Sequence, residues 1–277
     1  MKRNFMYVLV GAIGLSAASC SIFNKDKATV SKEAGAAVPT YEILDLPKVS
    51  LKDFKKNSSG AYVLFDGSSL NGWRGYNKDH VPSRWIIDNG TLKFSKAPAG
   101  VQNPEGGDLI FAHDFKNFEL EFEWNISHGG NSGVFFLAKE IKDQPIYISS
   151  PEFQLLDNEN HPDAKQGVDG NRKSSSLYDM IPAKPQNAFP AGEWNRAKIV
   201  VNKGKVTHYQ NDEKVVEYEL WTPEWTQLLE ASKFSKEQWP LAFELLKNVG
   251  GKSKSGVIGF QDHGDEVSLR NITVKEL

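Results

Sequence analysis

Apolar and polar residues alternate along many short stretches of this chain, and this pattern predicts β-strands separated by turns. The strictest example is 118–124, where apolar residues at every second position alternate with Glu119, Glu121 and Glu123. Further strands are expected wherever a short apolar or alternating run ends at Gly, Asn or Asp, namely at 61–65, 85–94 (a hairpin turning at 89–90), 134–137, 151–156, 196–201, 205–210, 215–218, 257–260 and 267–274.

Helix signals are scarce. Thr222 can cap a helix whose first residue is Pro223, and Trp225, Leu228 and Leu229 then share one side, so one short helix is expected near 223–231. Many short strands without βαβ alternation predict an all-β protein, a two-sheet jelly-roll β-sandwich. A second short helix is expected at about 51–55.

The N-terminus resembles a bacterial lipoprotein signal. Met1, Lys2 and Arg3 precede an apolar run at 5–15, and small residues lead to Cys20, the one cysteine of the chain. We therefore expect a signal peptide at 1–20, lipidation at Cys20, a flexible tether at 21–56 and a β-sandwich domain at 57–277. The mature protein would then be a secreted, lipid-anchored component of the cell envelope, periplasmic or on the outer membrane.

Charge and composition exclude some partners. The formal net charge is −2, from 33 basic and 35 acidic residues, and the basic residues form no stripe along the sequence, so nucleic acid is not an expected partner. Seven Trp, 8 Tyr and 16 Phe can fill a β core or stack on sugar rings, and their number does not separate these roles. No metal motif of regular spacing and no phosphate-binding glycine loop is present, so no cofactor is predicted, and the sequence leaves the metal requirement open.

Two segments carry more chemistry than a strand or turn requires. On a strand at 151–156, Glu152 and Gln154 share one face, and Asp157 follows at its end. The second segment is 261–265, with Gln261, Asp262 and His263 at the tip of an expected hairpin between 257–260 and 267–274. A long polar loop at 157–189 is expected to border the open face of the sandwich. Together these segments predict the two walls of a sugar cleft.

Other candidates have an ordinary structural explanation beside the functional one. Asn131, in an expected tight turn, either binds ligand or caps the turn, and His208 on a strand is more often structural. The alternating glutamates at 119–123 are similar to the acidic signature of retaining β-glucanases, although no aspartate lies between the outer two.

The chain resembles the 3-keto-disaccharide (3-keto-glycoside) hydrolase family, formerly a domain of unknown function, in the concanavalin A-like lectin and glucanase superfamily. The resemblance covers about 62–277 and depends on seven motifs in order: LFDGSSLNGW at 64–73, NFEL at 117–120, GNSGVFF at 130–136, EFQLLDN at 152–158, SLYD at 176–179, AGEWN at 191–195 and IGFQDHG at 258–264. The segment YQND at 209–212 departs from the Trp-Leu-Asn-Gly that the family tends to have.

The resemblance implies a hydrolase that cleaves 3-keto-glycosides, with a separate sugar 3-oxidoreductase supplying the ketone. A ketone at C3 acidifies the C2 proton, so a base can start an elimination of the C1 substituent, and hydration then completes a net hydrolysis. Glu152 or Asp157 is the expected base and His263 the expected acid. The expected substrate-binding residues, which donate hydrogen bonds or stack on sugar, are Asn131, Gln154, Tyr178, Lys184, His208, Gln261, Asp262 and Trp73.

Two alternatives remain open at this stage. The chain could be a retaining glycoside hydrolase that acts on ordinary glycosides through Glu119 and Glu123. It could also be a lectin-like glycan-binding module of the bacterial envelope, which needs only amide, carboxylate and aromatic contacts to a sugar.

Overall fold

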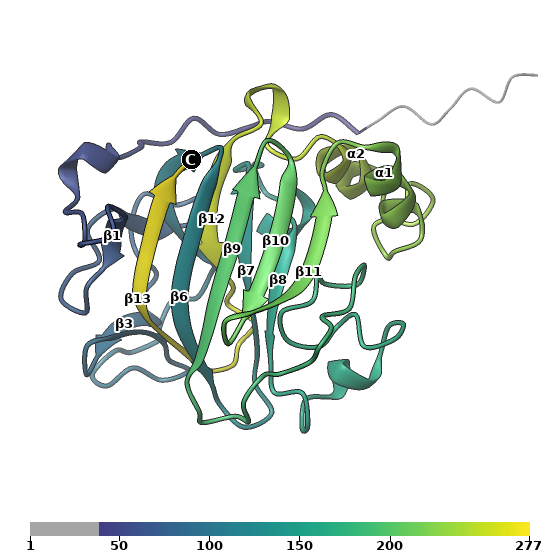
Figure 1. Cartoon of the computed structure of the whole chain (residues 1–277). Coiled ribbons are helices and arrows are strands. Elements are labelled where there is room, and N and C mark those ends of the chain that lie inside the picture. The colour runs from purple at the N-terminus through teal and green to yellow at the C-terminus, as the bar shows by residue number, and fades with distance from the viewer. Residues whose placement is uncertain (1–38) are drawn as a thin grey trace, which may run out of the picture. The chain divides into compact units, whose positions relative to one another are not determined.

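Two antiparallel β-sheets packed face to face make up the part of the chain that the computed structural model describes, residues 39–277 (Figure 1). The larger sheet has eight strands in the order β11-β10-β9-β6-β13-β4-β3, with β1 also paired to β13. The smaller sheet has five strands in the order β2-β5-β12-β7-β8. This arrangement confirms the predicted all-β sandwich. The expected signal peptide and Cys20 lie outside the described residues.

The strand boundaries agree with most of the predicted strands. The large sheet contains β1 (Tyr62–Phe65), β3 (Trp85–Asp88), β4 (Thr91–Phe94), β6 (Phe118–Ile126), β9 (Asn195–Asn202), β10 (Lys205–Gln210), β11 (Glu213–Glu219) and β13 (Val267–Glu276). The small sheet contains β2 (Trp73–Gly75), β5 (Leu109–Phe115), β7 (Asn131–Ala138), β8 (Glu152–Leu156) and β12 (Gly256–Phe260). Strands β2 and β5 were not predicted.

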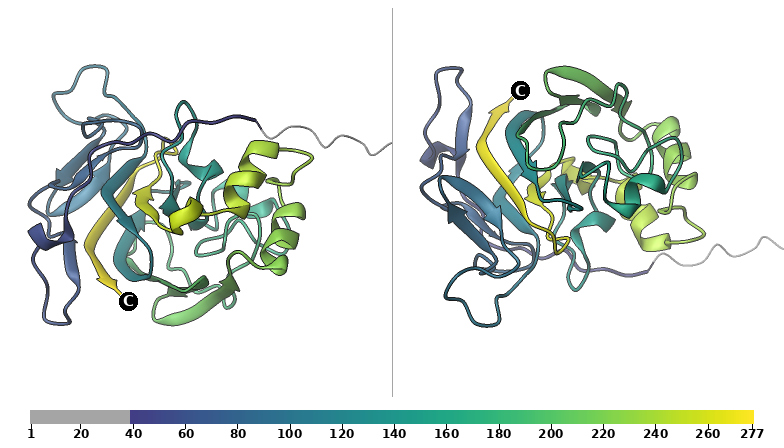
Figure 2. Two further views of the ribbon diagram at one scale, coloured as in Figure 1. Left: turned by 90° about the horizontal axis from the view of Figure 1, so that it is seen from above. Right: turned by 90° about the horizontal axis from the view of Figure 1, so that it is seen from below.

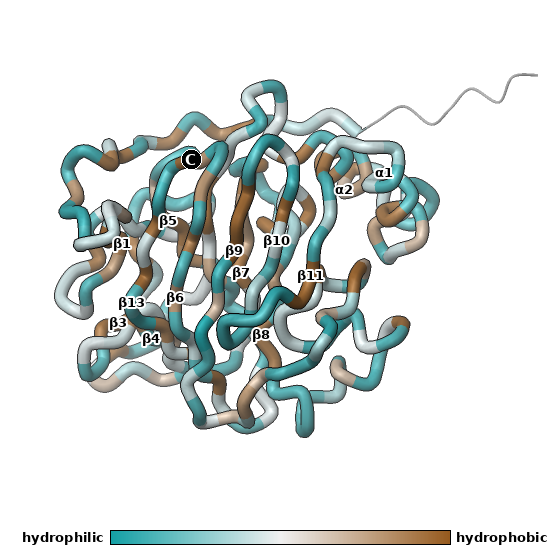
Figure 3. The backbone as a smooth tube through the Cα atoms, in the orientation of Figure 1, coloured by the Kyte–Doolittle hydropathy of each residue, from teal (hydrophilic) through white to brown (hydrophobic). Residues whose placement is uncertain are grey.

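The core lies between the two sheets. Figure 3 shows hydrophobic and hydrophilic residues alternating along β6, and its apolar residues Phe118, Leu120, Phe122 and Trp124 are all buried. The ring of Phe122 meets Phe153 of β8 and Phe260 of β12 edge-on, each with ring centroids 6.0 Å apart. Burial of these side chains supplies most of the driving force that holds the layers together.

The outer face of the small sheet is divided into an apolar end and a polar end. At the apolar end Ile110, Phe135 and Val257 form a second buried cluster with Ile146 of the 3-10 helix η2 (Ile146–Ile148). Glu152 faces the same way as Phe135, because these two residues are paired across β7 and β8. The polar end therefore begins next to a dry cluster, and its side chains are shielded from bulk water on that side.

Two helices pack beside β11, as Figures 1 and 2 show. Helix α1 (Pro223–Glu230) is the predicted one, and its Thr222 side chain accepts a hydrogen bond from the backbone N–H of Trp225. Helix α2 (Pro240–Lys247) was not predicted; the indole Nε1 of Trp225 donates to Leu246 O at 2.9 Å and joins the two helices. No helix among residues 39–277 is both long and apolar enough to cross a membrane.

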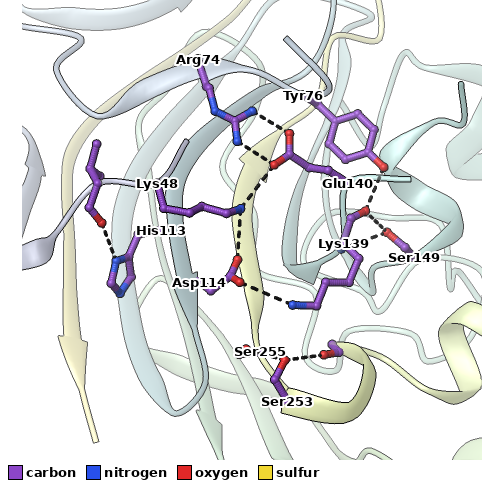
Figure 4. Close-up of polar contacts among 12 residues, drawn as sticks. Lys48, Arg74, Tyr76, His113, Asp114, Lys139, Glu140, Ser149, Ser253 and Ser255 are labelled. Carbon is purple, nitrogen blue, oxygen red and sulfur yellow. Dashed lines mark hydrogen bonds and ion pairs between the residues drawn. The ribbon is translucent and has the colours of Figure 1, made fainter. Parts of the chain in front are cut away.

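The packed domain begins earlier in the chain than the predicted boundary at residue 57. Leu44 N–H donates to Glu140 O and Val49 N–H to Ala112 O, and residues 51–53 form the short 3-10 helix η1 (Leu51–Asp53) where a helix was expected. Lys48 Nζ lies 3.2 Å from Asp114 and 3.3 Å from Glu140 (Figure 4). Residues 42–56, assigned to the tether from their composition, are therefore part of the sandwich.

The N-terminal segment is attached to the sandwich in part through a buried ion pair between Arg74 and Glu140. The two guanidinium nitrogens of Arg74 donate to the two oxygens of Glu140, each at 2.6 Å, and both side chains are almost fully buried (Figure 4). The Lys48 ammonium lies against the same carboxylate. Because breaking a buried pair leaves an uncompensated charge, Arg74, Glu140 and Lys48 form one structural unit rather than a site.

One predicted element is wrong. Strands β12 and β13 do not form a hairpin, because β12 belongs to the small sheet and β13 to the large one. The backbone N–H of Gln261 still pairs with Gly133 O beside β12, and the chain then crosses to the other sheet through Gly264 at φ 88°. Residues 261–266 are therefore a connection between sheets, which crosses one edge of the sandwich.

Two of the loops contain short 3-10 helices. The 3-10 helix η3 (Pro162–Lys165) lies in the long loop after β8, and η4 (Gly251–Ser253) precedes β12. Residues 131–133, expected to be a tight turn, are the first residues of β7, and the turn lies just before them at 127–130, where Gly130 N–H donates to Ser127 O.

Candidate functional site

A cavity of about 180 Å³ opens at the polar end of the small sheet. Its lining comes from segments that are far apart in the sequence: β7, η2, β8, the long loop after β8, the α1–α2 connection and the connection between the sheets. The lining residues are Asn131, Tyr147, Glu152, Gln154, Tyr178, Lys233, Gln261 and His263. Six of the predicted site residues are thus brought together, including two of the predicted catalytic residues, Glu152 and His263.

The floor of the cavity is built by strand pairing. On β8, Phe153 points into the core, so Glu152 and Gln154 point outward, as predicted. Gly133 of β7 pairs with Gln154 on one side and hydrogen-bonds to Gln261 N–H on the other. A Cβ atom at Gly133 would collide with Glu152 Oε1, so glycine leaves the room that this carboxyl group occupies.

Three side-chain amides in the cavity have oxygens without a hydrogen-bond partner. These are Asn131 Oδ1, Gln154 Oε1 and Gln261 Oε1, and all three side chains are at most 9 % exposed. Buried polar atoms in folded proteins are nearly always hydrogen-bonded, since an unpaired one costs free energy. Three unpaired amide oxygens in one small cavity therefore indicate a site prepared for a ligand that brings its own hydroxyl groups.

Glu152 is the most perturbed acid of the cavity. It is 8 % exposed, and burial raises its pKa to about 8, although the positive charge of Lys233 acts in the opposite direction. Burial lowers the pKa of Lys233, again against the effect of Glu152. A carboxyl group with a raised pKa next to a lysine with a lowered one is typical of acid–base sites. At neutral pH this pair can accept and return protons.

A chain of ion pairs holds the roof in place. Tyr178 Oη donates to Asp163 at 2.9 Å, and Arg172 joins Asp163 (2.9 Å) to Asp179 (2.7 Å). Asp179 also accepts the backbone N–H of Lys233 at 2.8 Å, so the long loop fixes the α1–α2 connection. The Lys233 ammonium lies 4.3 Å from the centroid of the Tyr178 ring. The 157–189 loop therefore does border the site, as predicted, and it positions both Tyr178 and Lys233.

The connection between the sheets supplies the wall opposite Glu152. Gln261 and His263 line the cavity, and His263 Nε2 lies 3.5 Å from Asn131 Nδ2. Asp262 does not line it; its carboxylate accepts from Gly107 N–H at 2.7 Å and from Gly264 N–H at 2.9 Å. Asp262 thus shapes the connection and leaves the contact with ligand to its neighbours.

Asp157 lies outside the cavity lining. Burial would raise its pKa, but hydrogen bonds from the backbone N–H groups of Gly129, Glu159 and Asn160 and from the Asn160 side chain lower it. Both carboxylate oxygens are used to join the loops after β6 and β8. Of the two candidate bases, only Glu152 faces the cavity.

Besides Asp262, three predicted binding residues do not line the cavity. Trp73 is a core residue that stacks on Phe260 and donates its indole N–H to Leu64 O at 2.8 Å. His208 is fully buried, where burial lowers its pKa to about 4. Lys184 is exposed on the loop, away from the lining residues. None of them can touch a ligand in this cavity without rearrangement.

The alternating glutamates face solvent on the other sheet. Glu123 forms an ion pair with Arg270 at 2.7 Å and accepts a hydrogen bond from Asn271 at 2.9 Å. Glu121 and Glu123 border a wider hollow of about 290 Å³ on the outside of the large sheet. These carboxylates lie on the opposite outer face of the sandwich from Glu152, so they form a separate surface with ordinary ion pairs.

Tyr147 and Lys233 are site residues that the sequence did not reveal. Tyr147 belongs to a three-residue 3-10 helix and Lys233 to the connection between α1 and α2. Neither lies in a periodic segment, so no spacing rule places its side chain. Neither lies in one of the seven motifs on which the family resemblance depends, whereas Tyr178 stands in SLYD.

Comparison with known proteins identifies close relatives. The sequence profile described as 3-keto-alpha-glucoside-1,2-lyase-like domain matches residues 60–275. A protein of Bacteroides thetaiotaomicron named 3-keto-disaccharide hydrolase is 62 % identical over 231 residues, which cover 80 % of each chain.

Solved structures agree with the architecture. A putative glycosyl hydrolase from Parabacteroides distasonis superimposes with a TM-score of 0.65 at 27 % identity, covering 79 % of this chain and 95 % of the other. A second putative glycosyl hydrolase from the same organism gives a TM-score of 0.59 at 22 % identity, covering 78 % and 99 %. The second likeness concerns the fold alone.

Proposed function

This chain belongs to the 3-keto-alpha-glucoside-1,2-lyase-like domain family, and we propose that it hydrolyses 3-keto-disaccharides in the cavity around Glu152. The name of the Bacteroides thetaiotaomicron relative, which is 62 % identical, supports the activity. The observation that carries the assignment to this cavity is the burial of one carboxyl group, Glu152, among amides that lack hydrogen-bond partners.

Glu152 is the proposed base. The ketone at C3 makes the C2 proton acidic, and the Glu152 carboxylate removes it while the electrons of the C2–H bond form the enolate of the C3 ketone. The ammonium of Lys233 is the proposed partner for the negative oxygen of that enolate, because it is the cation that lines the cavity. A base works best when its pKa is near the working pH, and the raised pKa of Glu152 meets this condition.

Bond cleavage follows from the enolate. Its electrons form a C1–C2 double bond and regenerate the C3 ketone, while the C1–O bond breaks and the leaving oxygen takes a proton from an acid. His263 is the proposed acid, since it lines the cavity opposite Glu152. Water then adds its oxygen to C1 and gives a proton back to His263, and Glu152, whose proton has exchanged with solvent, protonates C2. The sum of these steps is hydrolysis, with one water consumed.

The three amides are the proposed contacts to sugar hydroxyls. Asn131, Gln154 and Gln261 offer the acceptors that the cavity leaves unpaired, and Tyr147 offers a ring surface, whereas the Tyr178 ring already contacts Lys233. Sugar recognition in proteins commonly combines such planar amides with aromatic rings, so the lining suits one hexose ring with its ring oxygen and hydroxyls in contact with protein.

The experiment is turnover of a 3-keto-disaccharide by the purified chain in deuterated water. We expect hydrolysis with one deuterium at C2 of the released 3-keto sugar, and we expect Glu152→Gln to abolish it while a substrate analogue still binds. Glu121→Gln, on the outer face of the other sheet, is the matched control and should behave as wild type. Binding of glycans without cleavage of native or 3-keto sugars would instead favour a lectin-like role. Hydrolysis without deuterium at C2 would contradict the elimination route.

We also propose a place for this enzyme in the cell. The signal at 1–20 and Cys20 support secretion and lipid anchoring in the cell envelope, and a 3-keto substrate requires an oxidoreductase that oxidises the C3 hydroxyl of a glycoside. Metabolic labelling with palmitate tests the anchor, because Cys20→Ser should lose both the label and the membrane association.

A further inference from the structure

Two histidines and an aspartate gather at the rim of the cavity. His161 follows β8 in the long loop, and His263 and Asp265 lie in the connection between the sheets. Each offers one ligand atom, and the three atoms lie within 4.8 Å of one another. The two imidazole rings are nearly perpendicular, with centroids 6.1 Å apart. Among residues 39–277 this is the one such cluster of three.

Asn131 provides a second, independent observation at the same place. Its side chain is 3 % exposed, and its Oδ1 has no hydrogen-bond partner. Its Nδ2 lies 3.5 Å from His263 Nε2, and its backbone N–H donates to Asp265 Oδ2 at 3.2 Å. Asn131 therefore touches two members of the cluster and brings an unpaired oxygen to it. Rotation of the amide by 180° exchanges the oxygen and the nitrogen without changing the shape of the side chain.

We propose that His161, His263 and Asp265 bind a divalent transition-metal ion at the rim of the cavity, with Asn131 Oδ1 as a fourth donor. Two imidazoles and one carboxylate suit Zn²⁺, Mn²⁺, Fe²⁺ or Co²⁺ better than Mg²⁺ or Ca²⁺, which prefer oxygen ligands alone. Few protein donors leave coordination positions open, as is usual where a metal takes part in a reaction.

The position of the ion would give it a role in the reaction. His263 lines the cavity, so open coordination positions would face the bound sugar. A metal there would polarise the C3 carbonyl and stabilise the enolate as a Lewis acid, and water bound to the ion would then replace His263 as the acid for the leaving group. This role rests on the proposed function, whereas the binding of the ion does not.

Binding requires a local adjustment at His161 but none at Asp265. His161 Nδ1 now accepts the backbone N–H of Asp163 at 3.1 Å and caps η3, so the ring must turn to present a free lone pair to the ion. Asp265 Oδ1 contacts Lys96 Nζ at 2.8 Å, but a carboxylate oxygen has room for more than one partner. We therefore expect the ion to order the 161–165 segment in a new position while the rest of the sandwich stays as it is.

His80, Asp79 and Glu105 form a second group of a histidine with carboxylates, but its geometry does not suit a metal ion. His80 contacts Asp79 through Nδ1 and Glu105 through Nε2, each at 2.8 Å. These nitrogens point in different directions from one ring, so a single ion cannot be bound by all three residues. His80 is half-exposed and is not among the residues that line the cavity, and His80→Ala is therefore a matched control for loss of a histidine.

The test is calorimetric titration of the purified chain, prepared without a histidine tag and treated with chelator, with Zn²⁺ and with Mn²⁺. We expect one equivalent to bind to wild type and to His80→Ala, and at least a tenfold weaker affinity for His263→Ala and Asp265→Asn. Circular dichroism establishes that each variant is folded. No binding by wild type, or binding that both site variants retain, would overturn the site.

Measuring hydrolysis with and without the metal then tests whether the bound ion takes part in the reaction. Loss of hydrolysis after chelation, with recovery on adding the metal, supports the role toward the sugar, and undiminished hydrolysis by metal-free protein overturns that role. A chain that binds one ion at these residues but cleaves no 3-keto-disaccharide would leave the metal site standing and would count against the proposed function.

Discussion

Burial of Glu152 makes the rate of hydrolysis depend on pH in a way that few carboxylate bases do. Its pKa is raised to about 8, so the group is in its basic form only above that pH. At pH 7 about one molecule in ten carries the carboxylate, and at pH 9 about nine in ten do. We therefore expect kcat/KM, which reports ionisations of the free enzyme, to rise roughly tenfold between pH 7 and pH 9.

Lys233 should affect both the rising and the falling limb of the pH profile. Its positive charge holds the Glu152 pKa below the value that burial alone would produce, so Lys233→Met should move the rising limb to higher pH. Burial also lowers the pKa of Lys233 itself, so in wild type the rate should fall again where this lysine loses its proton. A bell-shaped profile is expected for wild type, and the part of the falling limb that belongs to Lys233 should be absent from the methionine variant.

The assay is release of the 3-keto sugar measured from pH 5 to pH 10, at substrate concentrations well below KM. Glu152→Gln should lose roughly 10² to 10⁴ of the rate at the wild-type optimum, which is the usual contribution of a general base, and the difference should shrink toward pH 5, where wild type itself lacks the carboxylate. A wild-type rising limb near the ordinary value for glutamate, 4.5, would refute the reasoning. If the pH profile of Lys233→Met is the same as that of wild type, the proposed effect of Lys233 on the Glu152 pKa is refuted.

Three further changes test the packing around the site. Gly133→Ala places a methyl group against the Glu152 carboxyl, so turnover should fall on the order of 100-fold while denaturant unfolding shows a loss of about 1–3 kcal/mol. Because His208 is buried with its pKa lowered to about 4, stability should fall by about 3 kcal/mol as the pH drops from 6.5 to 4, and urea titrations of His208→Gln should show much less of this slope. Glu123→Gln removes a partly exposed ion pair with Arg270, so it should cost less than about 1 kcal/mol in thermal unfolding and leave turnover unchanged.

Strand periodicity explains which parts of the fold were predictable. Strand β6 has one face in the core and one in solvent, so its sequence alternates and the strand was found. Strand β5 lies in the middle of the small sheet and is buried on both faces over much of its length, so 109–112 reads as a continuous apolar run that does not distinguish strand from helix. Local sequence also could not reveal that β12 and β13 belong to different sheets, because pairing partners are set by tertiary packing.

The same reasoning separates the site residues that were found from those that were not. Glu152 and Gln154 follow from the two-residue period of β8, and Gln261 and His263 from an excess of polar groups in a short connection. Lys233 reaches the cavity only because Asp179 binds its backbone and the 157–189 loop folds over the sheet. Asp157 illustrates the opposite error, since a carboxylate at a strand end is as suited to capping loops as to catalysis.

The number of carboxylates in the cavity bears on the reaction. Direct hydrolysis of a glycoside normally uses two carboxyl groups on either side of the scissile bond, about 5–5.5 Å or 6.5–9.5 Å apart. Of the residues in 39–277 that line this cavity, Glu152 alone carries a carboxyl group, and its other ionisable neighbours there are Tyr147, Tyr178, Lys233 and His263. One base with a raised pKa, facing a lysine and a histidine, matches the removal and return of a single C2 proton. The lining therefore suits the proposed elimination and hydration of a 3-keto sugar better than displacement at C1.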